Sequence, residues 1–188
     1  MSYNSWNQSL VTQQVDGTAL ASSTTATSLL APAARFTLPA NLLQVGTKLR
    51  VVASGRVSTL TASPGTLALD VRLGASTVIF NGGAMNLNTT AQTNASWSYD
   101  AELVVRSIGN GTVATILGTG TFSSRALIGS PAIASGYGGT ALLPDTAPVV
   151  GTGFDSTVAQ TLDFFGTWSV SNAANSILCH QFELVLCN

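Results

Sequence analysis

The chain has 188 residues, of which 45% are hydrophobic and only 8% are charged, and its formal net charge is −1. A chain of this length forms one domain or two small ones, and it buries a core large enough to need no cofactor or disulfide framework. So few charges argue against nucleic acid as the main partner, because binding to phosphates requires clustered Lys and Arg side chains. No apolar run is long enough to span a membrane.

The first 16 residues are polar, with isolated aromatic side chains at Tyr3 and Trp6, and we expect them to form an extended N-terminal arm. They contain neither the basic region nor the apolar region of a secretory signal, which predicts synthesis in the host cytoplasm. Residues 17–188 are predicted to form a single domain. Its first and last strands are expected at Thr18 to Leu30 and at Ile177 to Cys187.

Alternation of apolar and polar residues dominates this domain. Leu49, Val51 and Ala53 share one parity, and Lys48 and Arg50 share the other. The same period of two recurs at residues 66–73, 97–106, 157–170 and 177–187, and turn sequences such as the one at 110–111 separate the runs. No helical period is present, so the sequence predicts an all-β fold, an antiparallel β-sandwich that suits a jelly roll.

Residues 129–155 break the alternation. They are rich in Gly and Pro and are predicted to form a long loop or a pair of loops, which in compact domains tend to be functional or mobile. Within them, residues 136–141 (GYGGTA) match the loose form of a dinucleotide-binding fingerprint. Pro144 and Pro148 follow where that motif requires a helix, so we interpret the match as chance.

The sequence contains little from which to build a catalytic or metal site. His180 is the sole histidine, and its shared parity with Leu178 and Phe182 predicts a hydrogen-bonded residue in or near the core. Asp100 and Glu102 share one strand face and could form a carboxylate pair, but a solvated, cross-paired surface is the better interpretation. We therefore expect no enzyme activity, no cofactor and no bound metal.

Apolar residues on otherwise polar strand faces are more informative, because they suggest a subunit interface. Basic residues of one strand face would accompany them by pairing with acids of a neighbouring subunit, and Trp6 lies in the arm. The candidate subunit or capsid interface residues are Val52, Val104, Phe165, Val185, Lys48, Arg50, Arg56 and Trp6.

Four segments together resemble the virion proteins of tailed bacteriophages, in particular the capsid decoration (cement) and head-fibre proteins. These segments are TALASSTTATSLLAP, FTLPANLLQVGTKLRVVASGRVS, GTLALDVRLGASTVI and WSYDAELVVRSIGNGTVATILGTG. The similarity lies in the pattern of strand sequences separated by turn residues, and it involves no catalytic residues. It implies a jelly-roll or tumour-necrosis-factor-like sandwich that assembles as a homotrimer and binds the major capsid protein at the capsid surface of the virion.

Three functions remain open at this stage. The first is a trimeric decoration protein that stabilises a phage shell. The second is a fibre or receptor-binding module of the same fold that binds carbohydrate, with Tyr137 or Trp6 as the aromatic platform. The third, a hydrolase, would require His180 or the Asp100/Glu102 pair at an open cleft.

Overall fold

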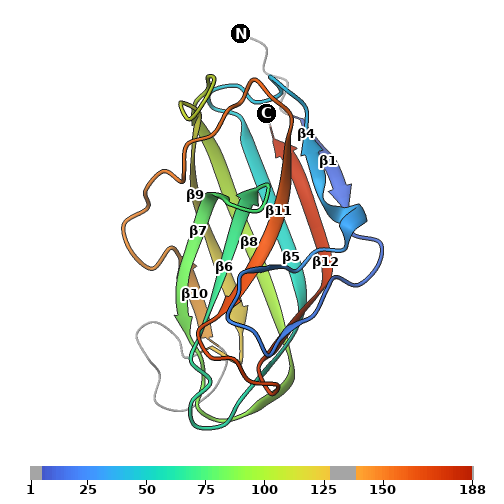
Figure 1. The fold of residues 1–188 in the computed structure, drawn as a ribbon, viewed down its shortest axis with the longest axis vertical. Coiled ribbons are helices and arrows are strands. Elements are labelled where there is room, and N and C mark those ends of the chain that lie inside the picture. Colours follow the sequence, from blue (N-terminus) through green and yellow to red (C-terminus); the bar gives the residue numbers. More distant parts are fainter. Residues whose placement is uncertain (1–5, 128–138, 188) are drawn as a thin grey trace.

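Two antiparallel sheets pack face to face in the computed structural model, which describes residues 6–127 and 139–187 (Figure 1). The larger sheet has the order β1-β12-β5-β8-β9-β10, with β2 also paired to β12. Its strands are β1 (Asn7–Thr12), β2 (Leu20–Ala21), β5 (Lys48–Thr59), β8 (Gln92–Ser107), β9 (Thr115–Ser124), β10 (Gly139–Leu143) and β12 (Ser176–Cys187).

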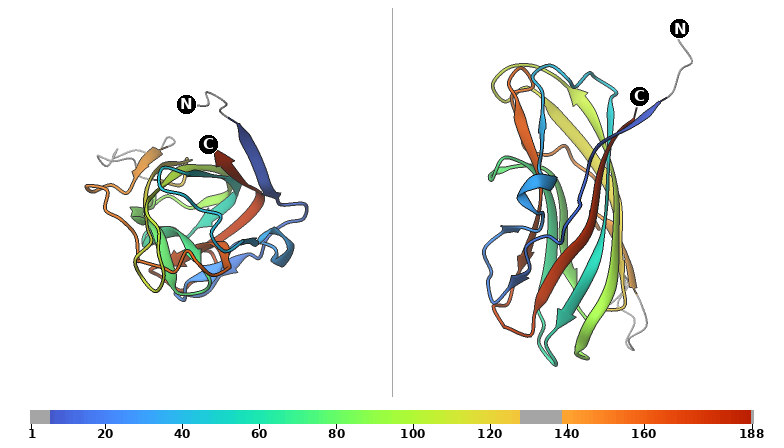
Figure 2. Two further views of the ribbon diagram at one scale, coloured as in Figure 1. Left: turned by 90° about the horizontal axis from the view of Figure 1, so that it is seen from above. Right: turned by 90° about the vertical axis from the view of Figure 1, so that its right-hand side faces the viewer.

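The smaller sheet has the order β3-β11-β6-β7, with β4 also paired to β11. Its strands are β3 (Thr27–Ser28), β4 (Phe36–Leu38), β6 (Thr66–Leu73), β7 (Thr77–Asn86) and β11 (Gln160–Trp168), and a short 3-10 helix, η1, covers Pro32–Ala34. Figure 2 shows the two sheets from the side, with β1 running along β12 of the larger sheet, whereas β3 and β4 pair with β11 of the smaller one. In the described part of the chain, no helix has the length and apolar character needed to cross a membrane.

The order of pairing is that of a jelly roll, because early strands pair with late ones in reverse order. Strands β1 and β2 pair with β12, β3 and β4 pair with β11, β5 pairs with β8, and β6 pairs with β7. Strands β9 and β10 then widen the larger sheet beyond this set. The predicted all-β antiparallel sandwich is thereby confirmed.

The core forms where the inward residues of the two sheets meet. Leu49, Val51, Leu69 and Val71 are fully buried, as their parity predicts. The ring of Tyr99 from the larger sheet packs against Phe164 from the smaller sheet, with centroids 4.8 Å apart. Such an aromatic contact contributes beyond its buried area.

A β-bulge in β12 changes the parity of that strand. Its register with β5 shifts between Cys179 and Gln181, so His180 is the extra residue. Before the bulge, Ile177 and Cys179 point into the core, whereas the sequence predicted that Leu178 would do so. His180 is hydrogen-bonded, as predicted, with its Nδ1 2.8 Å from Asp16 Oδ1, but the same change of parity leaves its side chain 37% exposed and outside the core.

The N-terminal segments are less regular than expected. The predicted strand from Thr18 to Leu30 is reduced to the two-residue strands β2 and β3, which pair with different sheets. The described part of the predicted arm is extended and lies along β12, where Asn7–Thr12 form β1. Hydrogen bonds from Gln13 and Gly17 to β12 carbonyls continue this contact past the bulge.

The Gly/Pro-rich segment 129–155 is not a loop throughout. Residues 139–143 form β10 at the edge of the larger sheet, and residues 128–138 lie outside the described residues. Further along, Gly151 N–H donates to Ile116 O of β9, and Thr152 N–H donates to Val78 O of β7. This stretch therefore joins the edges of the two sheets, which periodicity could not predict.

Candidate interaction surface

The outward side of the larger sheet holds six of the eight candidate interface residues and groups five of them, all but Arg56, at one end of β5. We call this side the outer face. Lys48 pairs in register with Val104, Arg50 pairs with Val185, and Val52 lies one row further along β5. The three valines are half-buried and the two basic side chains are exposed. Three neighbouring strands thus present valines among charges on one surface.

Both basic side chains beside the valines pair with acids of the same chain. Lys48 Nζ lies 3.2 Å from Glu102 Oε2, and Arg50 Nε donates to Asp100 Oδ1 at 2.9 Å. A second Arg50 nitrogen contacts the other oxygen of Asp100, so this pair is bidentate. The hydrogen bond from Arg50 lowers the pKa of the Asp100 carboxyl, and the same bond raises the pKa of Arg50.

Within one chain, Lys48 and Arg50 already have acidic partners, and the expectation that they pair with acids of a neighbouring subunit stays a prediction. Their partners come from β8 of the same chain, as diagonal neighbours across the β5–β8 ladder. The carboxylate pair of Asp100 and Glu102 is correspondingly a cross-paired surface, as predicted, and each acid is engaged by its own cation.

The remaining candidates lie away from these valines, and of the three only Arg56 is on the outer face. Arg56 is exposed near the far end of β5, where it hydrogen-bonds Ser96 Oγ. Trp6 directly precedes β1 and is 44% exposed. Phe165 belongs to the opposite sheet and is only 8% exposed, because the Arg72 guanidinium covers its ring at 4.6 Å from the centroid. It is packed within its own chain and is not part of the outer face.

The outward side of the smaller sheet holds a buried polar cluster that sequence reasoning missed. Asp163 Oδ1 accepts hydrogen bonds from Ser28 Oγ at 2.6 Å and from Phe164 N–H at 2.8 Å, and its Oδ2 lies 3.1 Å from Arg35 Nε. Desolvation nevertheless raises the pKa of Asp163, since burial outweighs these contacts. Arg72 donates to Asp70 at 2.7 Å beside it.

This cluster fastens the N-terminal segments to the sheet, because Ser28 lies on β3 and Arg35 directly follows η1. Asp70 and Asp163 lie far apart in the sequence, and only the register of β6 and β11 brings them together. The sequence signal that could have found the cluster is that Asp163 and Arg72 each occupy an outward, polar position of their alternating strands. Both carboxylates of the cluster are engaged in internal contacts, so we assign it a structural role, although Arg72 Nε is buried without a hydrogen-bond partner among the described residues.

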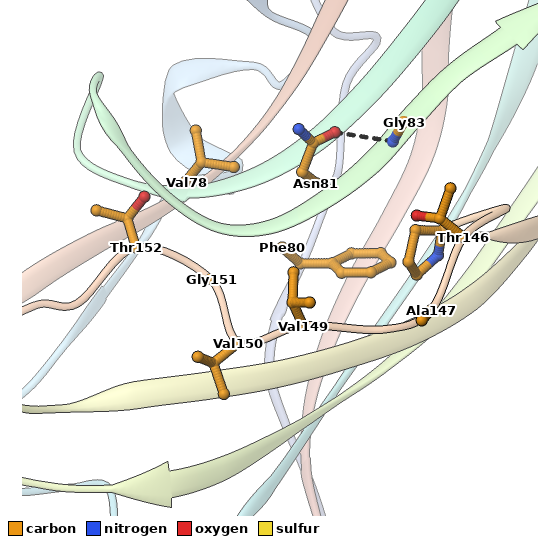
Figure 3. Close-up of a pocket in the computed structure, with 11 residues that line it drawn as sticks. Val78, Phe80, Asn81, Gly83, Thr146, Ala147, Val149, Val150, Gly151 and Thr152 are labelled. Carbon is orange, nitrogen blue, oxygen red and sulfur yellow. Dashed lines mark hydrogen bonds between the residues drawn. The ribbon is translucent and has the colours of Figure 1, made fainter.

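A groove of about 460 Å³ lies between β7 and the stretch of residues 144–152, also unpredicted (Figure 3). Figure 3 shows the Phe80 side chain of β7 facing the stretch that carries Val149 and Val150. None of the residues that line the groove is ionisable. Its walls of valine, threonine and glycine suit contact with a neutral or apolar group and supply no acid, base or nucleophile activated by a base.

The described residues contain no group of three or more His, Cys, Asp or Glu side chains placed to hold a metal ion. Among the described residues, the side-chain hydrogen-bond partner of His180 is Asp16, at the bulge. Of the dinucleotide-like motif, residues 139–141 begin β10, whereas 136–138, including Tyr137, lie outside the described residues. A strand in place of a helix agrees with the interpretation of that motif as chance.

Comparison with known proteins places the chain in no family. No protein-family model matches it, and no curated protein matches it. Among solved structures, one similar chain is the CBM2 module of the evolved Dit of Lactobacillus casei BL23 phage J-1, which is 13% identical with a TM-score of 0.34. The match covers 82% of this chain and 68% of that one. Similarity at this level carries no argument about function.

Proposed function

We propose that the protein is a structural component of a phage virion, a homotrimeric decoration protein that binds the major capsid protein and stabilises the shell from outside. On this proposal it has no catalytic role and needs no cofactor. The proposal is supported by the sequence resemblance to decoration and head-fibre proteins, by the jelly-roll topology, and by the chemistry of the outer face.

The outer face is the observation that carries the proposal. Val52, Val104 and Val185 stand half-buried beside two ion pairs of the same chain, Lys48 with Glu102 and Arg50 with Asp100. Glu183, opposite Val52 on β12, has no ion-pair partner among the described residues. Burying such a surface against a second copy removes apolar area from water without leaving Lys48 or Arg50 unpaired. The net charge of −1 adds little repulsion between copies.

On this proposal, the outer face of each chain packs against another copy of the same chain and forms the subunit interface. A surface of valines bordered by charged side chains is typical of an interface core with a polar rim. Contact with the shell would then use other surfaces of the trimer.

Binding to shells tests the function directly. Empty shells of the phage that encodes the chain, assembled without it, would be mixed with the purified protein and pelleted. We expect the protein to pellet with the shells at a fixed ratio and to raise the temperature at which they release their subunits. A folded protein that stays in the supernatant and leaves that temperature unchanged would overturn the proposal.

A further inference from the structure

The outer face carries a second feature, near the far end of β5 from the valines. Arg56, Asn94, Ser96 and Arg125 line an open pocket of about 340 Å³. All four side chains are polar and exposed. The proposed subunit contacts do not require this pocket, so its composition needs a separate explanation.

The two arginines differ from most other basic residues of the chain. Four of the seven Lys and Arg side chains, those of Arg35, Lys48, Arg50 and Arg72, form ion pairs with carboxylates. Within the described residues, neither pocket arginine has a carboxylate partner: Arg56 donates to Ser96 Oγ, and Arg125 donates to Thr93 O at 3.3 Å. Two uncompensated cations therefore share one pocket.

The strand register explains how they come to share it. Arg56 on β5 pairs with Ser96 on β8. On the other side of β8, Trp97 pairs with Ser124, the last residue of β9, and Arg125 follows in a turn, from which its guanidinium reaches Thr93 O beside Ser96. Two like charges that flank one serine repel each other, which is unfavourable unless an anion lies between them.

We propose that this pocket binds an oxyanion, namely a carboxylate, sulfate or phosphate group, either free in solution or carried by an acidic sugar. The guanidinium groups of Arg56 and Arg125 donate charge-assisted hydrogen bonds to the anion. The hydroxyl of Ser96 and the amide of Asn94 contact the remainder of the ligand. The volume lies in the range of small-molecule sites.

The surroundings of the pocket favour a hydroxylated ligand over an apolar one. The next row of the outer face is hydroxyl-rich across three strands, at Ser54, Ser98 and Ser123. Beyond it, Ser123 Oγ lies 2.8 Å from Thr140 Oγ1 of β10. These groups extend a polar, hydrated surface from the pocket toward the sheet edge, along which further sugar hydroxyls could bind.

The test is an amide chemical-shift titration of the full chain at constant ionic strength with three probes: inorganic phosphate, glucuronate and neutral glucose. We expect saturable shifts at residues 94–97 and 123–126 with an anionic probe, and none with glucose. Tighter binding of glucuronate would identify an acidic sugar as the source, and tighter binding of phosphate would identify the free anion. Both results support an oxyanion site.

Variants separate a built site from general electrostatics. Arg56→Met and Arg125→Met should each weaken binding of the preferred anion by about tenfold or more, the effect of losing a charge-assisted contact. Arg106→Met removes the same charge from an exposed position elsewhere on β8 and should leave the affinity unchanged. Non-saturable shifts with every probe, or equal losses in all three variants, would overturn the proposal.

Discussion

The buried carboxylate of Asp163 provides the sharpest test of the structure. Its side chain is 7% exposed, and its Oδ1 accepts both the Ser28 hydroxyl and the Phe164 N–H. Asp163→Ala would leave these two donors without an acceptor, at about 1–2 kcal/mol each. The ion pair with Arg35 adds less than about 1 kcal/mol, because that side chain is 37% exposed and screened by solvent. We expect a total loss of about 2–4 kcal/mol.

Asp163→Asn is the matched variant, because its amide oxygen can still accept from both donors while the buried charge is removed. We expect its stability at neutral pH to lie within about 1 kcal/mol of the wild type. Urea unfolding of the three proteins, followed by tryptophan fluorescence, measures these free energies. Equal destabilisation by Asn and by Ala would contradict this account of the cluster.

The pH dependence gives an independent check. Because folding raises the pKa of Asp163 above its ordinary value of 3.8, the folded chain binds a proton there more tightly than the unfolded chain does. The cost of the buried charge is complete above the raised pKa and disappears below 3.8. The wild type should therefore gain stability relative to Asp163→Asn as the pH falls through this window. A relative loss of stability on acidification would refute the assignment.

Three further changes test the packing and the surface. Tyr99→Phe should leave stability unchanged or raise it by about 1 kcal/mol in thermal unfolding, because the buried Tyr99 hydroxyl has no hydrogen-bond partner among the described residues; a large loss would show that it has one. Gly55→Ala should lower stability by about 1–3 kcal/mol or more, since its Cβ would lie 1.9 Å from Leu178 O, and a neutral effect would contradict that close approach. A double-mutant cycle on Lys48 and Glu102 should give a coupling below about 1 kcal/mol that falls with added salt, whereas a salt-independent coupling would mean that the pair is buried.

The alternation of residues predicted five long strands of this fold, β5, β6, β8, β11 and β12, together with the core residues that β5, β6 and β8 contribute. Between Lys48 and Arg106, every predicted inward position named above is buried, because a half-buried strand must alternate. The same reasoning failed at His180, since one extra residue in β12 reverses parity without any local signal. It also failed at Thr18–Leu30, where the hydroxyl-rich composition suggested a single strand and the chain instead passes from one sheet to the other.

The candidate interface was predictable only as separate residues. Parity identified Val52, Val104 and Val185 as outward-facing, but only the strand order places them on one sheet and Phe165 on the other. The ion pairs of Lys48 and Arg50 within the chain could not be predicted, because the pairing of β5 with β8 was unknown. The pocket between Arg56 and Arg125 was missed for the same reason, because residues far apart in sequence meet through register.

The solution mass of the protein, measured by light scattering during size-exclusion chromatography, tests the proposed assembly most directly. The double variant Val104→Glu/Val185→Glu suits this test, because the register partners Lys48 and Arg50 can accommodate the new carboxylates in a monomer, whereas a buried interface cannot. Val149→Glu, at a 75% exposed position on the stretch that joins the sheet edges, is its control.

The account predicts three times the 19.2 kDa of one chain for the wild type and for Val149→Glu, and a monomer for the double variant. A monomeric wild type, or a trimer that survives both new carboxylates, would contradict the assignment of the outer face as the subunit interface.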